Sequence, residues 1–285
     1  MTTATLSSRR SVWCRPVERS IEAVDRRSAP SEDGLTHHLF LIALGFGASL
    51  AAGLATGVGA LPALFAARAT NKMLDAMLGF AAGVMLAVAA FGLILPAFDT
   101  GAVGITVLGV LCGVVLFGIA DRLTPHLHFI SGLEGPPSHL QRVWLLVLAM
   151  TIHNLPEGLA VGVAFGREDI AAAVIIAIGI GIQNMPEGLT VALPLVREGY
   201  RPARAIGWAT LTGLAEPMTA LIGATLVLLI GPLLPFGLAF AAGCMLYVTL
   251  DEVIPESHSR GHHMEATTGA VLGFVLMTAL ERLFS

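Results

Sequence analysis

The sequence predicts an all-α integral membrane protein of eight transmembrane helices. Hydrophobic residues make up 55% of the 285 residues and charged residues only 13%, whereas a soluble chain has roughly 25% charged residues. Eight segments each hold about twenty mostly apolar residues, the length of a helix that crosses a bilayer. They are too long for barrel strands, so we expect a helical bundle. The net charge of −4 leaves no basic face for nucleic acid.

The eight expected helices define a domain over residues 38–285. In chain order they cover roughly residues 39–66, 76–98, 101–121, 143–166, 170–196, 203–230, 234–255 and 266–284. Residues 1–37 mix Arg with Asp, Glu and Ser and lack the apolar stretch of a cleaved signal peptide, so we expect a disordered tail or a start codon placed too early. Gly and Pro residues between 132 and 137 indicate that the longest connector, 122–142, is a loop.

The connectors differ in Lys and Arg, and this difference predicts orientation. The three connectors after helices two, four and six hold only Arg167, and the other four hold Arg68, Lys72, Arg122, Arg142, Arg197, Arg201, Arg204 and Arg260. Cytoplasmic loops are rich in Lys and Arg. Both termini are therefore expected outside the cytoplasm and the connector 122–142 inside. The arginine-rich tail argues the other way, but most of it lies too far from the first helix to count.

Two internal repeats are visible. Helix two contains Phe80-Ala-Ala-Gly-Val-Met85-Leu and then Leu95-Pro96, and helix seven contains Phe240-Ala-Ala-Gly-Cys-Met245-Leu and then Ile254-Pro255. Helices two and seven hold mirror positions about the centre of the chain, which predicts two inverted three-helix units flanking a central pair. Secondary transporters commonly use inverted repeats, with the substrate site near mid-membrane.

The central pair carries the second repeat. His153-Asn-Leu-Pro-Glu157-Gly in helix four recurs as Gln183-Asn-Met-Pro-Glu187-Gly in helix five, and Glu216 lies midway along helix six. An ionised Glu at a helix centre costs about 2.5 kcal/mol or more to insert. Three carboxylates at one depth would repel one another, and no Lys or Arg is near them in sequence. A bound divalent cation would remove that repulsion.

The spacing of the other polar side chains favours the same interpretation. His153 and Glu157, four residues apart, reach the same point, as do Gln183 and Glu187. Pro156, Pro186 and Pro217 lack an N–H and free the carbonyls four residues before them, so kinked helices would widen a cavity and offer oxygen ligands. Imidazole, carboxylate and amide together suit Zn²⁺ or Fe²⁺. A lone buried His could instead be a packing residue and a lone Glu a proton relay, but the duplication favours metal.

His153-Asn154-x-Pro156-Glu157-Gly158 and Gln183-Asn184-x-Pro186-Glu187-Gly188 resemble the ZIP (Zrt-, Irt-like protein) family of divalent metal transporters, specifically its GufA-type prokaryotic branch. The resemblance covers about residues 38–285. It implies uptake of Zn²⁺, with Cd²⁺, Fe²⁺ and Mn²⁺ as further substrates, into the cytoplasm across a bacterial inner membrane, and a homodimer. No catalytic cofactor is expected, because the metal is the substrate.

The resemblance also implies a two-metal centre. Its residues would be Met85, His153, Asn154, Glu157, Gln183, Asn184, Glu187 and Glu216. Some relatives carry Asp where Asn184 stands, so the neutral amide is expected to weaken one of the two sites.

Weaker candidates for the metal pathway lie near helix ends. Asp99 ends helix two on the predicted outer side and could collect cations. Asp251 and Glu252, near the inner end of helix seven, could line an exit, and His258 follows them. For the histidines of the connector 122–142, weak metal capture and a plain solvated loop remain alternatives; these residues are His126, His128 and His139.

Two other functions compete with transport. An intramembrane metalloprotease needs HExxH, but Asn154 follows His153 here and cannot act as a base. A di-iron enzyme needs Glu-x-x-His pairs, and this chain has His-x-x-x-Glu. An enzyme is therefore not expected, and no GxxxxGK[ST] motif is present for ATP hydrolysis. A metal sensor that binds without transporting would carry the same residues, so that alternative stays open.

Overall fold

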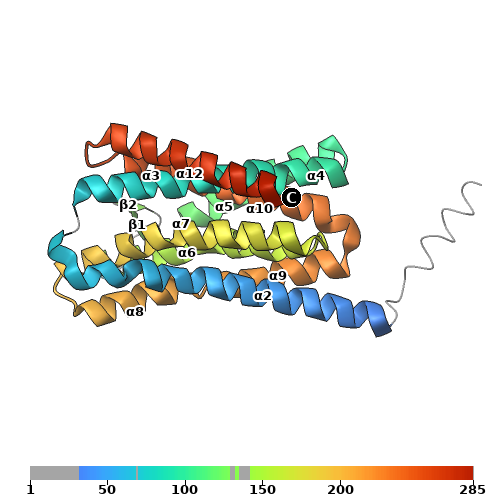
Figure 1. The fold of residues 1–285 in the computed structure, drawn as a ribbon, viewed down its shortest axis with the longest axis horizontal. Helices are drawn as coiled ribbons and strands as arrows, with labels where there is room; N and C mark the ends of the chain where they lie inside the picture. Colours follow the sequence, from blue (N-terminus) through green and yellow to red (C-terminus); the bar gives the residue numbers. More distant parts are fainter. Residues whose placement is uncertain (1–31, 69, 129–131, 135–141, 285) are drawn as a thin grey trace, which may run out of the picture. The chain divides into compact units, whose positions relative to one another are not determined.

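The computed structural model describes residues 32–68, 70–128, 132–134 and 142–284. It divides into a short N-terminal unit that ends at Phe40 and a compact unit over Leu41–Ser285, which holds the sites discussed below. Within the described residues, eight helical segments are long and apolar enough to cross a membrane. This confirms the predicted fold class. Figure 1 shows these helices running along a common direction.

The helical segments are as follows, in chain order. The first four are α2 (Glu32–Ala60) with the 3₁₀ segment η1 (Leu61–Arg68); α3 (Asn71–Ala87) with η2 (Val88–Ile94) and α4 (Leu95–Thr100); α5 (Val103–Leu123); and α6 (Arg142–Phe165). The last four are α7 (Ile170–Arg197); α8 (Pro202–Gly213) with α9 (Glu216–Leu229); η3 (Gly231–Leu233) with α10 (Leu234–Val248), η4 (Thr249–Val253) and α11 (Ile254–Ser257); and α12 (His263–Phe284).

Two sequence-based expectations for the segments outside the membrane helices need correction. Residues 32–37, expected in the polar tail, belong to α2, because a helical backbone satisfies its own hydrogen bonds whatever the side chains are. The rest of that tail lies outside the described residues. The connector 122–142 contains two short strands, β1 (His126–His128) and β2 (Gly132–Glu134), which pair antiparallel. Part of the expected loop is thus a short hairpin. His139 lies outside the described residues.

The sixth membrane segment is broken, where a single helix over 203–230 was expected. Helix α8 ends at Gly213 and α9 begins at Glu216. Pro217 has no N–H to donate to the Gly213 carbonyl, so one helical hydrogen bond is missing at this point. The first turn of a new helix accepts both a proline and an acidic residue well. The break places Glu216 at the N-terminus of α9.

The repeated sequences of helices two and seven have the same local structure. Both η2 and η4 are π-helical, and each ends in an N–H that bonds five residues back, from Leu95 to Ala90 and from Ile254 to Thr249. In each case the next residue is a proline, which cannot continue the α-helical pattern. The repeat therefore reproduces a widened turn at the equivalent point of both helices.

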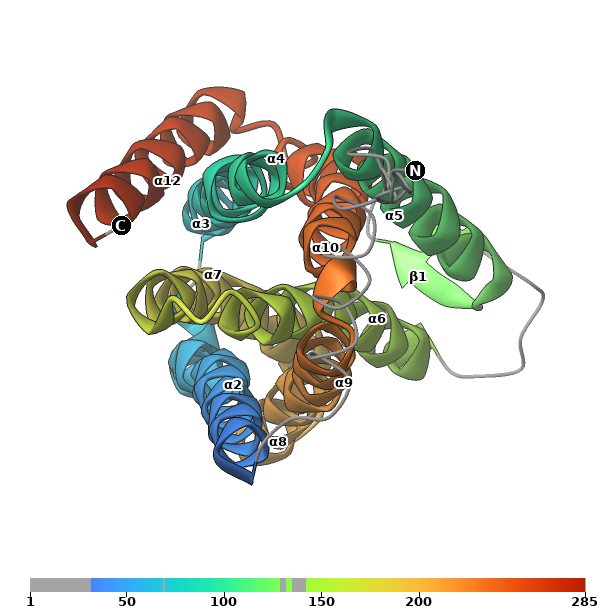
Figure 2. The same ribbon diagram turned by 90° about the vertical axis from the view of Figure 1, so that its right-hand side faces the viewer.

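Helices of the compact unit pack in close pairs. Helix α3 runs along α12, and α5 along α10 (Figure 2). A Cβ atom added at Gly83 would lie 1.9 Å from the Ala270 carbonyl oxygen, so only glycine permits this approach. Helix α6 packs along α9, and α7 contacts both α3 and α8. The motif helices α6 and α7 thus lie between the helix pairs α3–α12 and α5–α10 on one side and the helices α8 and α9 on the other.

Candidate metal centre

The polar residues of the duplicated motif are buried together in the middle of the compact unit. His153, Asn154 and Glu157 lie on α6. Their counterparts in α7 and the first residue of α9 complete the set, namely Gln183, Asn184, Glu187 and Glu216. None of these seven residues is more than 3% exposed. Such burial is costly for ionisable groups unless they are paired or bind a cation.

The glycine that closes each copy of the motif sets the spacing between helices. A Cβ atom at Gly158 would lie 2.1 Å from the carbonyl oxygen of Glu216 in α9. At Gly188 the corresponding distance is 1.8 Å, to the carbonyl oxygen of Thr56 in α2. Each motif helix therefore touches a neighbouring backbone beside its glutamate. This role of the two glycines was missed in the sequence, where they could be seen only as part of a repeat.

Three of the buried side chains are arranged to share one ion. One ligand atom each from His153, Glu157 and Glu187 lies within 4.8 Å of the other two. His153 Nε2 is 3.6 Å from Glu187 Oε1. Because Zn²⁺ sits about 2.0–2.2 Å from nitrogen and oxygen ligands, two of its ligands lie about 3.4 Å apart at tetrahedral angles. The group is thus close to the geometry that a divalent ion needs.

Several oxygen atoms around this group have no hydrogen-bond partner. Both carboxylate oxygens of Glu187 are buried without one. The same is true of the following acceptors: Glu157 Oε2, Glu216 Oε2, Gln183 Oε1, Asn184 Oδ1 and Asn154 Oδ1. Buried polar atoms normally have a partner. A set of oxygens that all lack one is suited to a cation.

The two amides of α7 each hold one carboxylate. Gln183 Nε2 donates a hydrogen bond to Glu157 Oε1. Asn184 Nδ2 donates to Glu216 Oε1 at 2.6 Å and to the Ala52 carbonyl oxygen at 2.9 Å. Each amide thereby occupies one oxygen of its glutamate and leaves the other without a partner. The hydrogen bonds from the two amides partly offset the negative charge of Glu157 and Glu216, and both carboxylates remain able to bind an ion.

Glu252 belongs to this group, although the sequence suggested it only as an exit residue. Its Oε2 lies 3.2 Å from His153 Nδ1, so the imidazole stands between Glu252 and Glu187. A carboxylate on the far nitrogen fixes the tautomer and ring orientation of a metal-binding histidine. Glu252 lies in η4, whose π turn the sequence did not reveal; the only signal was Pro255 within the repeat.

The remaining candidates do not contact these ligands in the described contacts. Met85 is fully buried in α3, and its Sδ accepts a hydrogen bond from Thr249 Oγ1 at 3.6 Å. Asp99, at the end of α4, and Asp251, in η4, are exposed. His258 bonds to Ser257, Ile254 and Thr267. The place of Met85 in the metal centre stays a prediction, as does a pathway role for Asp99, Asp251 and His258.

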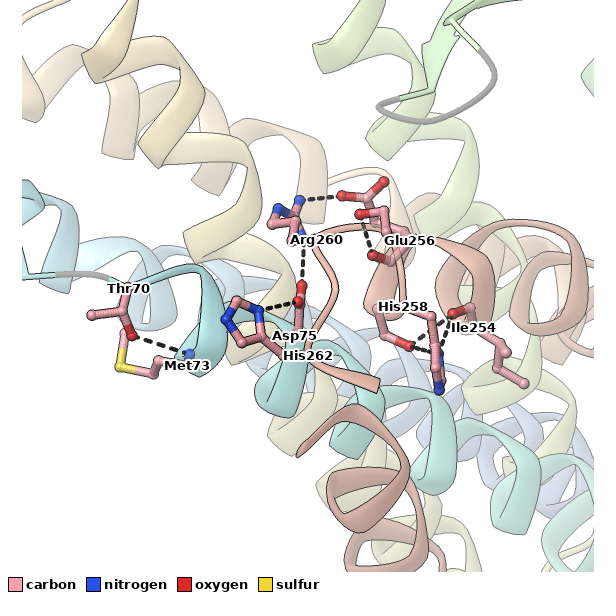
Figure 3. A network of polar contacts seen from close by, with 10 residues as sticks. Thr70, Met73, Asp75, Ile254, Glu256, His258, Arg260 and His262 are labelled. Atoms are coloured by element: carbon pink, nitrogen blue, oxygen red, sulfur yellow. Dashed lines mark hydrogen bonds and ion pairs between the residues drawn. The ribbon is translucent and has the colours of Figure 1, made fainter. Parts of the chain in front are cut away.

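A separate ion-pair network ties α3 to the turn between α11 and α12 (Figure 3). The fully buried carboxylate of Asp75 accepts hydrogen bonds from Arg260 Nη1 at 2.8 Å and His262 Nδ1 at 2.9 Å. Arg260 also pairs with Glu256. The Arg260 cation and the hydrogen bond from His262 thus compensate Asp75, which distinguishes it from the glutamates of the metal centre.

Comparison with known proteins gives one consistent result. A family model described as ZIP Zinc transporter matches residues 134–281. "Zinc transporter GufA" of Myxococcus xanthus is 44% identical over 83% of this chain and 97% of its own length. "Zinc transporter ZIPB" of Bordetella bronchiseptica is 42% identical over 86% and 81%, and "Zinc transporter ZIP11" of Homo sapiens is 34% identical over 79% and 93%.

Proposed function

The chain belongs to the ZIP family, and we propose that it is a secondary transporter that moves Zn²⁺ into the cytoplasm through the centre around His153, Glu157 and Glu187. The relatives are named as zinc transporters, which favours a transporter over an enzyme. Cd²⁺, Fe²⁺ and Mn²⁺ are further candidate substrates. One imidazole among carboxylates suits a borderline ion such as Zn²⁺ or Fe²⁺ better than Mn²⁺.

The buried oxygens without partners carry this proposal. An ion that enters the centre loses its hydration shell and needs replacement ligands. Glu187 offers two free oxygens and Glu157 offers one, while His153 offers Nε2 because Glu252 holds Nδ1. The ion in turn removes the repulsion between the carboxylates. Binding is therefore favourable without a fixed counter-charge such as Lys or Arg, which would compete with the ion.

A second ion would bind beside the first, and more weakly. Glu216, Asn154 and Asn184 supply its ligands, and of these only Glu216 is charged. Asn184 donates its amide hydrogens to Glu216 and to the Ala52 carbonyl oxygen, so it can offer the ion only a neutral oxygen. We propose that this second position is emptied readily, which would let the ion move on.

The orientation and assembly of the protein are part of the same proposal. The distribution of Lys and Arg supports both termini outside the cytoplasm in a bacterial inner membrane, with β1 and β2 on the inner side. The homodimer implied by the family resemblance is included, and mass photometry on the purified protein tests it.

Flux into sealed vesicles tests the function. We expect proteoliposomes with the wild-type chain to accumulate Zn²⁺ down its gradient without ATP. Glu187→Gln should abolish uptake because the site loses a charged ligand. Glu198→Gln is the matched control, since Glu198 is exposed at the end of the same helix. Tight binding without flux would instead identify a sensor and refute transport.

A further inference from the structure

An apolar groove opens on the surface of the compact unit, and none of the proposed metal ligands lines it. It lies between the α3–α12 pair and α7 and has a volume of about 700 Å³. It follows α3 from Met73 to Phe80 and α12 from Met264 to Leu272, about 10–12 Å along each helix at 1.5 Å per residue. A groove of this length along two membrane spans can hold part of one hydrocarbon chain.

The side chains along this groove are unusually adaptable. Four of the ten methionines of the chain line it, namely Met73, Met77, Met185 and Met264. Met264 is 80% exposed, and Met73 and Met185 are 38% and 39% exposed. Methionine is unbranched and flexible, and it is over-used at surfaces that adapt to varied apolar partners. Such side chains can adjust to the shape of an acyl chain.

One end of the groove carries a charge of each sign. Lys72 Nζ and Glu265 Oε1 are 2.6 Å apart, and their side chains are 63% and 29% exposed. Glu265 lines the groove, and both residues stand at the start of their membrane spans, at the depth of lipid headgroups. The pair has no net charge, so it does not select an anion. It complements a headgroup that itself contains one cation and one anion.

We propose that this groove binds a phosphatidylethanolamine molecule of the surrounding bilayer. One acyl chain lies along the methionines, the phosphate is held by the Lys72 ammonium, and the ethanolamine ammonium donates to Glu265. The hydrogen bond between Lys72 and the phosphate and the one between the ethanolamine ammonium and Glu265 are both charge-assisted. A trimethylammonium headgroup cannot donate such a bond, and an anionic headgroup without an ammonium would face Glu265 unpaired. The occupant would also touch Met185 and Pro186, next to Glu187.

Native mass spectrometry of the purified full-length chain tests this assignment. The protein is mixed with equal amounts of phosphatidylethanolamine, phosphatidylglycerol and phosphatidylcholine that carry identical acyl chains. We expect the ethanolamine lipid to be retained several-fold more than the other two. Glu265→Gln should remove this preference, because the ethanolamine ammonium loses its carboxylate. Lys72→Gln should weaken the retention of all three lipids, because each of them carries the phosphate.

A pair of tryptophan variants locates the site. Thr268 is exposed on α12 and lines the groove, and its hydroxyl bonds only within its own helix in the described contacts. Thr268→Trp should therefore fill the groove and abolish lipid retention. Val275→Trp is the control, since Val275 is 58% exposed on the same helix and does not line the groove. Equal retention of the three lipids, a preference for another headgroup, or retention by Thr268→Trp would overturn the proposal. None of these readouts depends on zinc transport.

Discussion

At the scale of single residues, the chemistry of the metal centre depends on how each buried oxygen or nitrogen is occupied. His153 has a carboxylate on either side of its ring, and the two amides of α7 each bind one glutamate. The type of these residues could be predicted from the sequence, because the repeated motif placed them at helical spacing. Their hydrogen-bond partners outside the motif could not, since these come from α2, α9 and η4, far apart along the chain.

Glu252 gives the first prediction at this scale. Glu252→Gln should lower zinc affinity by about 10–100-fold, the usual cost of losing a carboxylate that orients a ligating histidine. Isothermal titration of the detergent-purified protein measures it. Glu198→Gln, a change at an exposed carboxylate at the end of α7, is the control and should leave affinity unchanged. Unaltered affinity in Glu252→Gln would show that Glu252 does not act through His153.

Asn184 gives the second prediction at the scale of single residues. Asn184→Asp adds a negative charge at the weaker position, where water is scarce and charges are poorly screened. We expect the variant to bind a second ion per chain that the wild type holds loosely, and to turn over more slowly because that ion leaves less readily. Metal-to-protein stoichiometry after desalting measures the binding. Two tightly held ions in the wild type, or no gain in the variant, would contradict the proposed asymmetry.

At the scale of helices, the prolines and glycines decide where the ligands stand. Pro217 indicated a freed carbonyl at Gly213, but a kink and a full break are both consistent with a missing N–H. The outcome depends on packing, because a Cβ atom at Gly213 would lie 2.2 Å from the Gly53 carbonyl oxygen of α2. The π turn of η4, which brings Glu252 to His153, likewise has no signal in the sequence beyond Pro255.

A substitution at Gly158 tests whether the contact between α6 and α9 positions the metal ligands. Gly158→Ala forces a Cβ atom against the Glu216 carbonyl, so α6 and α9 must separate. We expect a stability loss of about 1–3 kcal/mol, typical of overpacking, together with reduced zinc uptake, because Glu216 moves away from Glu157. Gly207→Ala is the control, since nothing lies within 4 Å of a Cβ atom there. Thermal unfolding in detergent and vesicle uptake measure the two effects; full uptake in Gly158→Ala would show that this helix contact does not position the site.

At the scale of the compact unit, the helix arrangement explains why so many polar groups can remain buried. The pairs α3–α12 and α5–α10 and the helices α8 and α9 surround α6 and α7, so the polar residues of the repeated motif are buried within protein. Eight helices and a duplicated core motif were predictable because hydrophobic length and repetition are local properties of the sequence. The apolar groove beside α7 was not, because its walls come from three separate helices.

The central claim is that zinc binds at the buried group of His153, Glu157 and Glu187. Zinc K-edge X-ray absorption on the protein loaded with one equivalent tests it most directly, because the spectrum distinguishes imidazole from oxygen ligands. We predict one imidazole with oxygen ligands at about 2.0–2.2 Å, and loss of the imidazole signal in His153→Ala. A spectrum with two or more imidazoles, or one unchanged in His153→Ala, would place the ion elsewhere and contradict this claim.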